Sequence, residues 1–160
     1  MNFLRALAVF LFLPVVVGLA IPQALVSSDS WNRGSDPVGL ALAIAGFAGL
    51  VWSISEFYRV ARRTLEPWAA PRRLVTSGPY RFLRNPMYVA ALTLVIGQAW
   101  WLHSLEVALY SAVLAVMFYL RVTLYEEPWL ASTFARDWDV YKARVGRWGP
   151  KSLKFRAQPR

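Results

Sequence analysis

Four apolar stretches dominate this chain of 160 residues and leave little sequence between them. An α-helix needs roughly 20 residues to cross a bilayer core of about 30 Å. The stretches therefore predict membrane-spanning helices at about 3–26, 38–60, 87–101 and 105–124. The third is short and requires an oblique position or a locally thinner bilayer. We expect an all-α, polytopic membrane helix bundle of four transmembrane helices, forming one integral membrane domain over residues 1–160.

The composition excludes several kinds of active site. The chain is 57% hydrophobic and contains no cysteine, so disulfides, thiolate metal sites and a cysteine nucleophile are excluded. With His103 as the single histidine, we expect no histidine-based metal centre. The net charge of +9 would suit nucleic acid in a soluble protein. Here the basic residues border the apolar stretches, so membrane lipids are the expected partner and nucleic acid is not.

The distribution of Lys and Arg predicts the orientation. The loop from Arg59 to Arg84 holds seven Arg and one acid, and the segment after Tyr125 holds eight Lys or Arg. By the positive-inside rule, both termini and this loop face the cytoplasm, and an even number of spans satisfies that assignment. The alternative is a cleaved signal peptide at the N-terminus, which would leave an odd number of spans. The short chain favours a prokaryotic plasma membrane.

The second stretch carries small residues and one unusual acid. Ala41, Ala45 and Gly49 recur every four residues and predict close helix packing within the chain, with a homodimer interface as the alternative to a monomer. Glu56 is flanked by apolar residues and precedes Arg59 by three positions, so the two side chains share one helix face. A carboxylate in that position is a candidate for a functional role.

Two polar segments lie on either side of the last apolar hairpin. The first is GPYRFLRNPMY, from Gly78 to Tyr88, and the second contains Arg121 and the adjacent pair Glu126 and Glu127. Folding the hairpin returns the acids towards the first segment. Adjacent acids at a helix end are as often simply solvated, but Arg121 on the same helix and Arg81 and Arg84 across the hairpin offer partners for a partly buried carboxylate. Such a mixed set suits a ligand with both an ammonium and a carboxylate.

The start of the third helix and the C-terminal segment complete the candidate site. Pro86 suits the first helical turn, so Asn85 is the expected N-cap, and the free amides there either are merely capped or receive an anion. After Pro128 we expect an amphipathic helix over about 127–146, which either lies on the membrane or closes over a cofactor. Its apolar stripe is formed by Leu130, Phe134, Trp138, Tyr141 and Val145.

In these segments the sequence resembles the integral membrane methyltransferases of the isoprenylcysteine carboxyl methyltransferase and phospholipid methyltransferase group. The resemblance covers about residues 71–150 and rests on GPYRFLRNPMY, Glu126-Glu127, Leu130, Phe134, Tyr141 and VGRWGP in that order. It implies S-adenosylmethionine as methyl donor, S-adenosylhomocysteine as product and no metal. It also implies catalytic roles for Arg84, Asn85 and Glu127, and donor binding by Tyr80, Arg84, Asn85, Pro86, Tyr88, Arg121, Glu126, Glu127, Tyr141, Arg147 and Trp148.

The chain departs from this pattern in two places. Many members have His where this chain has Asn85; an amide can donate a hydrogen bond but cannot act as a base. Members also often have Gly and Tyr where Ala135 and Trp138 stand, which we take as mild changes on an amphipathic helix. The resemblance leaves the amphiphilic acceptor open between a prenylcysteine carboxylate, a phospholipid amine and a thiol. Two other functions remain as alternatives: a non-catalytic protein binding anionic lipid or a partner, and a nicotinamide-dependent membrane reductase.

Overall fold

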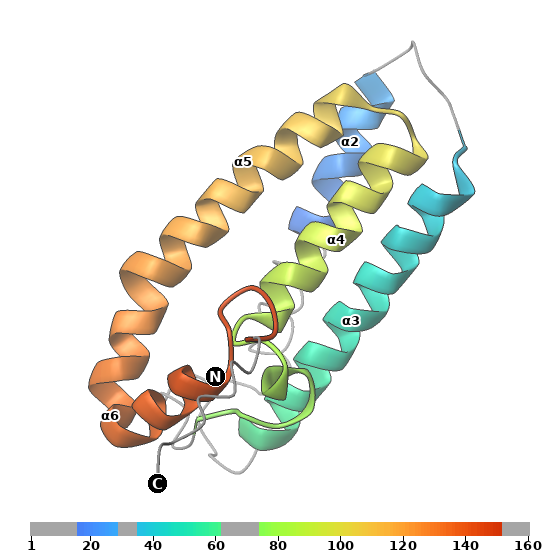
Figure 1. The fold of residues 1–160 in the computed structure, drawn as a ribbon. Helices are drawn as coiled ribbons and strands as arrows, with labels where there is room; N and C mark the ends of the chain where they lie inside the picture. Colours follow the sequence, from blue (N-terminus) through green and yellow to red (C-terminus); the bar gives the residue numbers. More distant parts are fainter. Residues whose placement is uncertain (1–15, 29–34, 62–73, 152–160) are drawn as a thin grey trace, which may run out of the picture.

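A computed structural model describes residues 16–28, 35–61 and 74–151, and these residues form a helical bundle (Figure 1). The long helices are α3 (Pro37–Ala61), α4 (Pro86–Trp101), α5 (Leu105–Arg121) and α6 (Glu127–Arg144). Shorter elements are the π-helical turns η1 (Val16–Ala20) and η3 (Val122–Glu126), the helix α2 (Ile21–Ser28) and the 3-10 turn η2 (Gly78–Arg81). No β-strand occurs in these three ranges, which confirms the all-α prediction for them.

Two helical segments of the described residues are long and apolar enough to span a membrane. They are Pro37–Val60 and the continuous run Leu105–Arg144. Helix α4 has 16 residues, or roughly 24 Å at 1.5 Å per residue, so it falls short of the bilayer core, as its sequence predicted. The first predicted span is described only from Val16 onwards, because residues 3–15 lie outside the described ranges. The prediction of four spans is therefore not confirmed.

The outward faces of the long helices carry large apolar side chains. Ile44 and Phe47 on α3 and Leu109, Val113 and Met117 on α5 are exposed. A soluble domain rarely leaves so much contiguous apolar surface in water. Together with the span-length helices, these faces support a position in the lipid bilayer.

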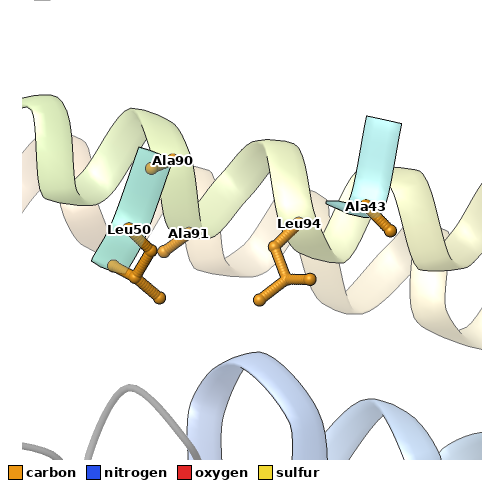
Figure 2. Packing of buried hydrophobic residues seen from close by; sticks show 5 residues of the cluster. All are labelled: Ala43, Leu50, Ala90, Ala91 and Leu94. Carbon is orange, nitrogen blue, oxygen red and sulfur yellow. The ribbon is translucent and has the colours of Figure 1, made fainter. Parts of the chain in front are cut away.

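Helices α3 and α4 pack with their backbones in contact. A Cβ atom added to Gly46 would lie 2.3 Å from the Leu94 nitrogen, and one added to Gly97 would lie 2.3 Å from the Ala43 nitrogen. Figure 2 shows the apolar residues beside this contact, with Leu94 pointing to the side on which η1 and α2 lie. The packed residues are Ala43, Leu50, Ala90, Ala91 and Leu94.

The predicted small-residue face was partly wrong. Ala41 and Ala45 are exposed, whereas Gly46, also a small residue of this stretch, packs against α4 together with Gly39 and Ala43. The helices approach this closely because a methyl group at Gly39, Gly46 or Gly97 would meet the backbone of the other helix. Packing within the chain is confirmed; a homodimer interface stays a prediction.

A compact turn joins α4 to α5 at the end of the bundle far from η2 (Figure 1). The amides of Ser104 and His103 donate to the carbonyls of Ala99 (3.0 Å) and Trp100 (3.2 Å), which is the Schellman pattern that ends many helices. His103 takes the left-handed position, with φ of 49°. The hydroxyl of Ser104 then caps α5 by accepting from the Val107 amide. The turn thus fixes α5 antiparallel to α4.

The N-terminal helical segment is attached to α4 by a buried side chain. The Gln98 amide nitrogen donates to the Gly18 carbonyl at 2.7 Å, inside the π-helical turn η1. Pro22 follows that turn, and the helix continues to Ser28 rather than ending. Pro22 has no amide hydrogen to donate to the carbonyl four positions earlier, which is that of Gly18, and Gln98 supplies a donor to this carbonyl.

The C-terminal helix bends sharply, contrary to the predicted uninterrupted amphipathic helix. Ala135 has φ of 40° and ψ of −108°, which separates α6 into two helical halves. This conformation is one that glycine adopts readily and residues with a Cβ avoid. The presence of alanine at position 135, where family members often have glycine, is therefore not the mild change that we expected. The predicted stripe still packs as one cluster, comprising Trp138, Tyr141 and Val145 with Leu74, Leu130 and Phe134.

Candidate functional site

The two polar segments meet at the end of the bundle where α4 begins and α6 folds back. Figure 1 shows the segment around η2 beside the red C-terminal end of α6. Leu83 and Gly146 form an isolated β-bridge, and the Arg84 amide donates to the Gly146 carbonyl at 2.9 Å. The Tyr141 hydroxyl donates to the Tyr80 carbonyl at 2.6 Å. These backbone contacts hold the residues before α4 against the residues after α6.

Glu127 is the centre of a buried charge cluster. Its Oε1 lies 3.0 Å from Arg84 Nη1, and Arg147 binds both carboxylate oxygens, with Nε at 2.9 Å and Nη2 at 2.7 Å. The side chains of Arg84 and Glu127 are only 8% and 10% exposed. The Arg84 guanidinium also lies over the Trp138 ring, 5.4 Å from its centroid. With two arginines and one glutamate, this cluster carries a formal charge of +1.

Some polar atoms at this site have no hydrogen-bond partner among the described residues. They include Arg84 Nε, Arg84 Nη1 and the Tyr80 hydroxyl, all of which are buried. Arg84 Nη1 is near enough to Glu127 for an ion pair, but the direction of its N–H bonds does not make a hydrogen bond. Leaving buried donors unsatisfied costs about 1–3 kcal/mol each, so such groups indicate a place where a polar ligand belongs.

Burial also changes the protonation behaviour of these groups. It lowers the pKa of the Arg84 guanidinium, although arginine remains charged at neutral pH. It raises the pKa of the Tyr80 hydroxyl above its ordinary value, so this group stays neutral and is available as a donor to a ligand. Hydrogen bonding to Glu127 raises the pKa of Arg147. Under neutral conditions the site therefore offers cationic and neutral donors together.

Glu126 faces a second, more open cluster. Its Oε1 accepts hydrogen bonds from the Tyr88 hydroxyl and from Arg121 Nε, the latter at 2.8 Å. The Arg121 side chain is 66% exposed, and the Tyr88 ring contacts Phe118 with centroids 4.6 Å apart. Successive residues on a helix point about 100° apart, which explains why the adjacent acids have different partners. The sequence predicted the arginine partners but not this division.

The remaining predicted residues lie close to these clusters. Asn85 occupies the N-cap position of α4, but its side chain makes no cap hydrogen bond and donates instead to the Arg147 carbonyl at 3.3 Å. Pro86 is the buried first residue of α4. Trp148 is half-buried after Arg147. Arg81, a predicted charge partner, lies over the Phe82 ring instead.

Two residues were not predicted from the sequence. They are Trp138 at this site and Ser77, whose hydroxyl donates to Glu56. Trp138 faces Arg84 because the bend at Ala135 turns the second half of α6 back towards η2. The aromatic stripe was the available signal, but a straight helix would not have brought it there. In the described ranges, no group of three or more His, Cys, Asp or Glu side chains could hold a metal ion.

Helical architecture, apolar outer faces and two helical segments of span length among the described residues support a helical membrane protein with a charged site at one end of the bundle. The chain belongs to the phospholipid methyltransferase family, whose sequence model matches residues 37–137 and which is part of the isoprenylcysteine carboxyl methyltransferase-like group. The match includes α3, η2, α4, α5 and the first half of α6. The suspected family resemblance is thereby confirmed.

A curated relative is the cobalt-zinc-cadmium resistance protein CzcN of Cupriavidus metallidurans. The two are 33% identical over 149 residues, which cover 90% of this chain and 64% of the relative. The chain thus spans somewhat less than two thirds of the length of that protein. No solved structure matches the chain.

Proposed function

We propose that this protein transfers a methyl group from S-adenosylmethionine to a lipid-like or otherwise hydrophobic acceptor at the cytoplasmic boundary of a prokaryotic plasma membrane. Family membership supports a methyltransferase. The observation that carries the proposal is the set of three buried, unsatisfied donors, Arg84 Nε, Arg84 Nη1 and the Tyr80 hydroxyl, beside the Glu127 cluster. The cytoplasmic orientation is supported by the arginines that flank this end of the bundle.

The site residues fit the donor. Its carboxylate suits the unsatisfied guanidinium of Arg84 in a cluster whose formal charge is +1. Glu126 or Glu127 would hold the ammonium, and the faces of Trp138 and Tyr141 would lie against the sulfonium. Glu127 already binds two arginines, so it also keeps Arg84 charged and in place while the donor carboxylate binds.

The proposed reaction requires alignment more than acid–base chemistry. When bound, the donor supplies an electrophilic methyl group, whose carbon–sulfur bond breaks as the bond to the acceptor forms. The chain contributes by fixing the reactants and excluding water, since a well-oriented pair reacts far faster than one meeting freely. Asn85 supports this arrangement through its hydrogen bond to the Arg147 carbonyl and offers no base.

The acceptor would reach the site from the lipid. Arg121 and Glu126 form the more exposed side of the site, and the exposed apolar residues Leu120 and Leu124 are close to them in the α5–η3 segment. An amphiphile could place its chain along these residues and its polar end near Tyr88. The metal-resistance name belongs to the relative, and its whole-protein role is not carried over to this chain.

The proposal is tested by donor binding to the full chain purified in detergent. Calorimetric titration with S-adenosylhomocysteine should show binding that Arg84→Ala and Glu127→Ala abolish, while Arg136→Ala, a change at an exposed arginine on α6, leaves it unchanged. No binding to the wild type, or equal binding to all variants, would sink the proposal and favour a lipid- or partner-binding protein. Adding NADPH to the protein bound to S-adenosylhomocysteine tests the reductase alternative. We expect NADPH not to displace S-adenosylhomocysteine.

Acceptor class is decided by a second experiment. Bacterial lipid extracts incubated with the enzyme and isotopically labelled S-adenosylmethionine should yield one labelled lipid class by mass spectrometry. Labelling of an ester, an amine or a thioether distinguishes a carboxylate, an amine and a thiol acceptor. Label appearing equally with Arg84→Ala would contradict a role for the cluster in transfer.

A further inference from the structure

Glu56 is a buried acid outside the clusters described above. It lies on α3 about one turn before the helix ends, and its side chain is 9% exposed. Arg59 binds both carboxylate oxygens, with Nε at 3.0 Å and Nη2 at 2.7 Å, but the arginine side chain is 71% exposed. An exposed arginine gives no reason for the carboxylate itself to be buried. The reason lies on the opposite side, in the segment before η2.

The segment containing Ser77 and Gly78 is built against Glu56. The Ser77 hydroxyl donates to Glu56 Oε1 across 21 positions of sequence. That hydroxyl is thereby diverted from capping η2, where Ser77 is the N-cap residue without a side-chain cap. Gly78 has φ of +57°, and a Cβ added to it would lie 2.6 Å from Glu56 Cγ. Close contact and backbone conformation therefore each require glycine beside this carboxylate.

From Gly78 the chain leads directly to the candidate site. Two residues on, the Tyr80 carbonyl accepts from the Tyr141 hydroxyl, and the Tyr80 hydroxyl is one of the unsatisfied donors. The amides of Phe82 and Leu83 both donate to the Pro79 carbonyl, so η2 is one continuous turn. Arg84 follows, with its amide on Gly146 and its guanidinium beside Glu127. Hence the position of η2 on α3 determines where Arg84 and Tyr80 lie.

We propose that Glu56 is a positioning residue for donor binding: through Ser77 and Gly78 it fixes η2 to the end of α3 and so holds Tyr80 and Arg84 where the donor binds. The effect of Glu56 on donor binding rests on the proposed methyltransferase function, whereas its effect on the position of η2 does not. A charged carboxylate suits the task because it binds Arg59 and Ser77 together, and the three hydrogen bonds that they donate to it are charge-assisted.

The test compares Glu56→Gln with Glu106→Gln in the full chain in detergent. Glu106 is a matched control because its Oε2 also accepts from a serine hydroxyl, that of Ser104 at 3.0 Å, at the opposite end of the bundle. Hydrogen–deuterium exchange should show the amides of Tyr80, Phe82 and Arg84 exchanging about tenfold faster in Glu56→Gln, the equivalent of one charge-assisted hydrogen bond. The α5 amides should be unchanged, and the control should match the wild type at η2.

The consequence for function is measured by titration with S-adenosylhomocysteine. We expect Glu56→Gln and Ser77→Ala each to weaken binding about tenfold while the unfolding midpoint stays close to that of Glu106→Gln. Unchanged exchange at η2, or faster exchange throughout α5 as well, would overturn the positioning role. Wild-type affinity in both variants would overturn its link to the donor. If the wild type itself bound no S-adenosylhomocysteine, the proposed function would fail while the exchange result would still decide the role of Glu56.

Discussion

Replacing Ala135 by glycine should stabilise the protein. The residue has φ of 40° and ψ of −108°, a conformation in which a Cβ atom is crowded by the neighbouring peptide groups. Such strain costs on the order of 1–3 kcal/mol. Glycine removes it at a cost of roughly 0.5–1 kcal/mol in unfolded-chain entropy. The Ala135 side chain is exposed, so no buried methyl group is lost. We expect a net gain of about 1 kcal/mol.

The assay is thermal unfolding in detergent, followed by intrinsic tryptophan fluorescence. For a chain of this length, 1 kcal/mol corresponds to a rise of about 2–4 °C in the midpoint. Ala131→Gly is the control, because Ala131 is also exposed on α6 but has regular helical backbone angles. There glycine should cost about 1 kcal/mol and lower the midpoint. The two substitutions are chemically identical, so only the backbone angles predict opposite signs.

The reasoning would be refuted by a lower midpoint in both variants. That result would mean that residue 135 continues the helix, and Trp138 would then not face Arg84 as described. A rise in both variants would equally contradict the assignment, because Ala131 has no strain to release.

Three further predictions concern stability. Glu127→Gln should cost about 2–3 kcal/mol, because it leaves the buried charge of Arg84 without its counter-ion. Gly46→Ala should cost about 2 kcal/mol, because its methyl would meet the α4 backbone, whereas Gly149→Ala, with no atom within 4 Å of the new methyl, should be neutral. His103→Gly should gain about 0.5–1 kcal/mol, because the residue is exposed and has positive φ. Unfolding midpoints measure all three.

For each of these three predictions, one result would contradict the reasoning. An unchanged midpoint in Glu127→Gln would mean that Arg84 is solvated. Equal effects at Gly46 and Gly149 would mean that α3 and α4 are not in backbone contact. A loss of stability in His103→Gly would mean that the α4–α5 turn has another conformation.

The limits of the long helices were predictable from sequence because polar or proline residues mark them. The predicted span 38–60 is α3 at Pro37–Ala61, and 87–101 is α4 at Pro86–Trp101. The fourth span was predicted to end at 124, but α5 ends at Arg121 and continues through η3 without leaving helical geometry. Apolar content fixes where a helix lies in the sequence; the π turn changes only its hydrogen bonding.

Part of the charge pairing at the candidate site was predictable from the sequence, but its arrangement was not. Charge complementarity indicated that arginines would return to the Glu pair, and they do. Which acid binds which arginine depends on the direction of each side chain, which the sequence does not specify. The bend at Ala135 carried no signal in this chain's own residues, since alanine favours helices. The glycine that family members often have at this position was the available signal for a turn, and we took its replacement as a mild change. The partnership of Ser77 with Glu56 crosses 21 positions and follows no periodic pattern.

The backbone contact between α3 and α4 has a consequence for motion. Glycines at this contact leave no side-chain layer that could slide or repack, so the two helices must move together. The turn between α4 and α5 is pinned by its own hydrogen bonds at the far end of the bundle. Any widening that admits a bulky hydrophobic molecule is then expected to come from movement of the η3 end of α5 away from α4, together with the start of α6, which continues from η3. Arg121 and Glu126 are joined to Tyr88 at the start of α4. We expect these hydrogen bonds to hold α5 against α4 and to break when the two helices separate.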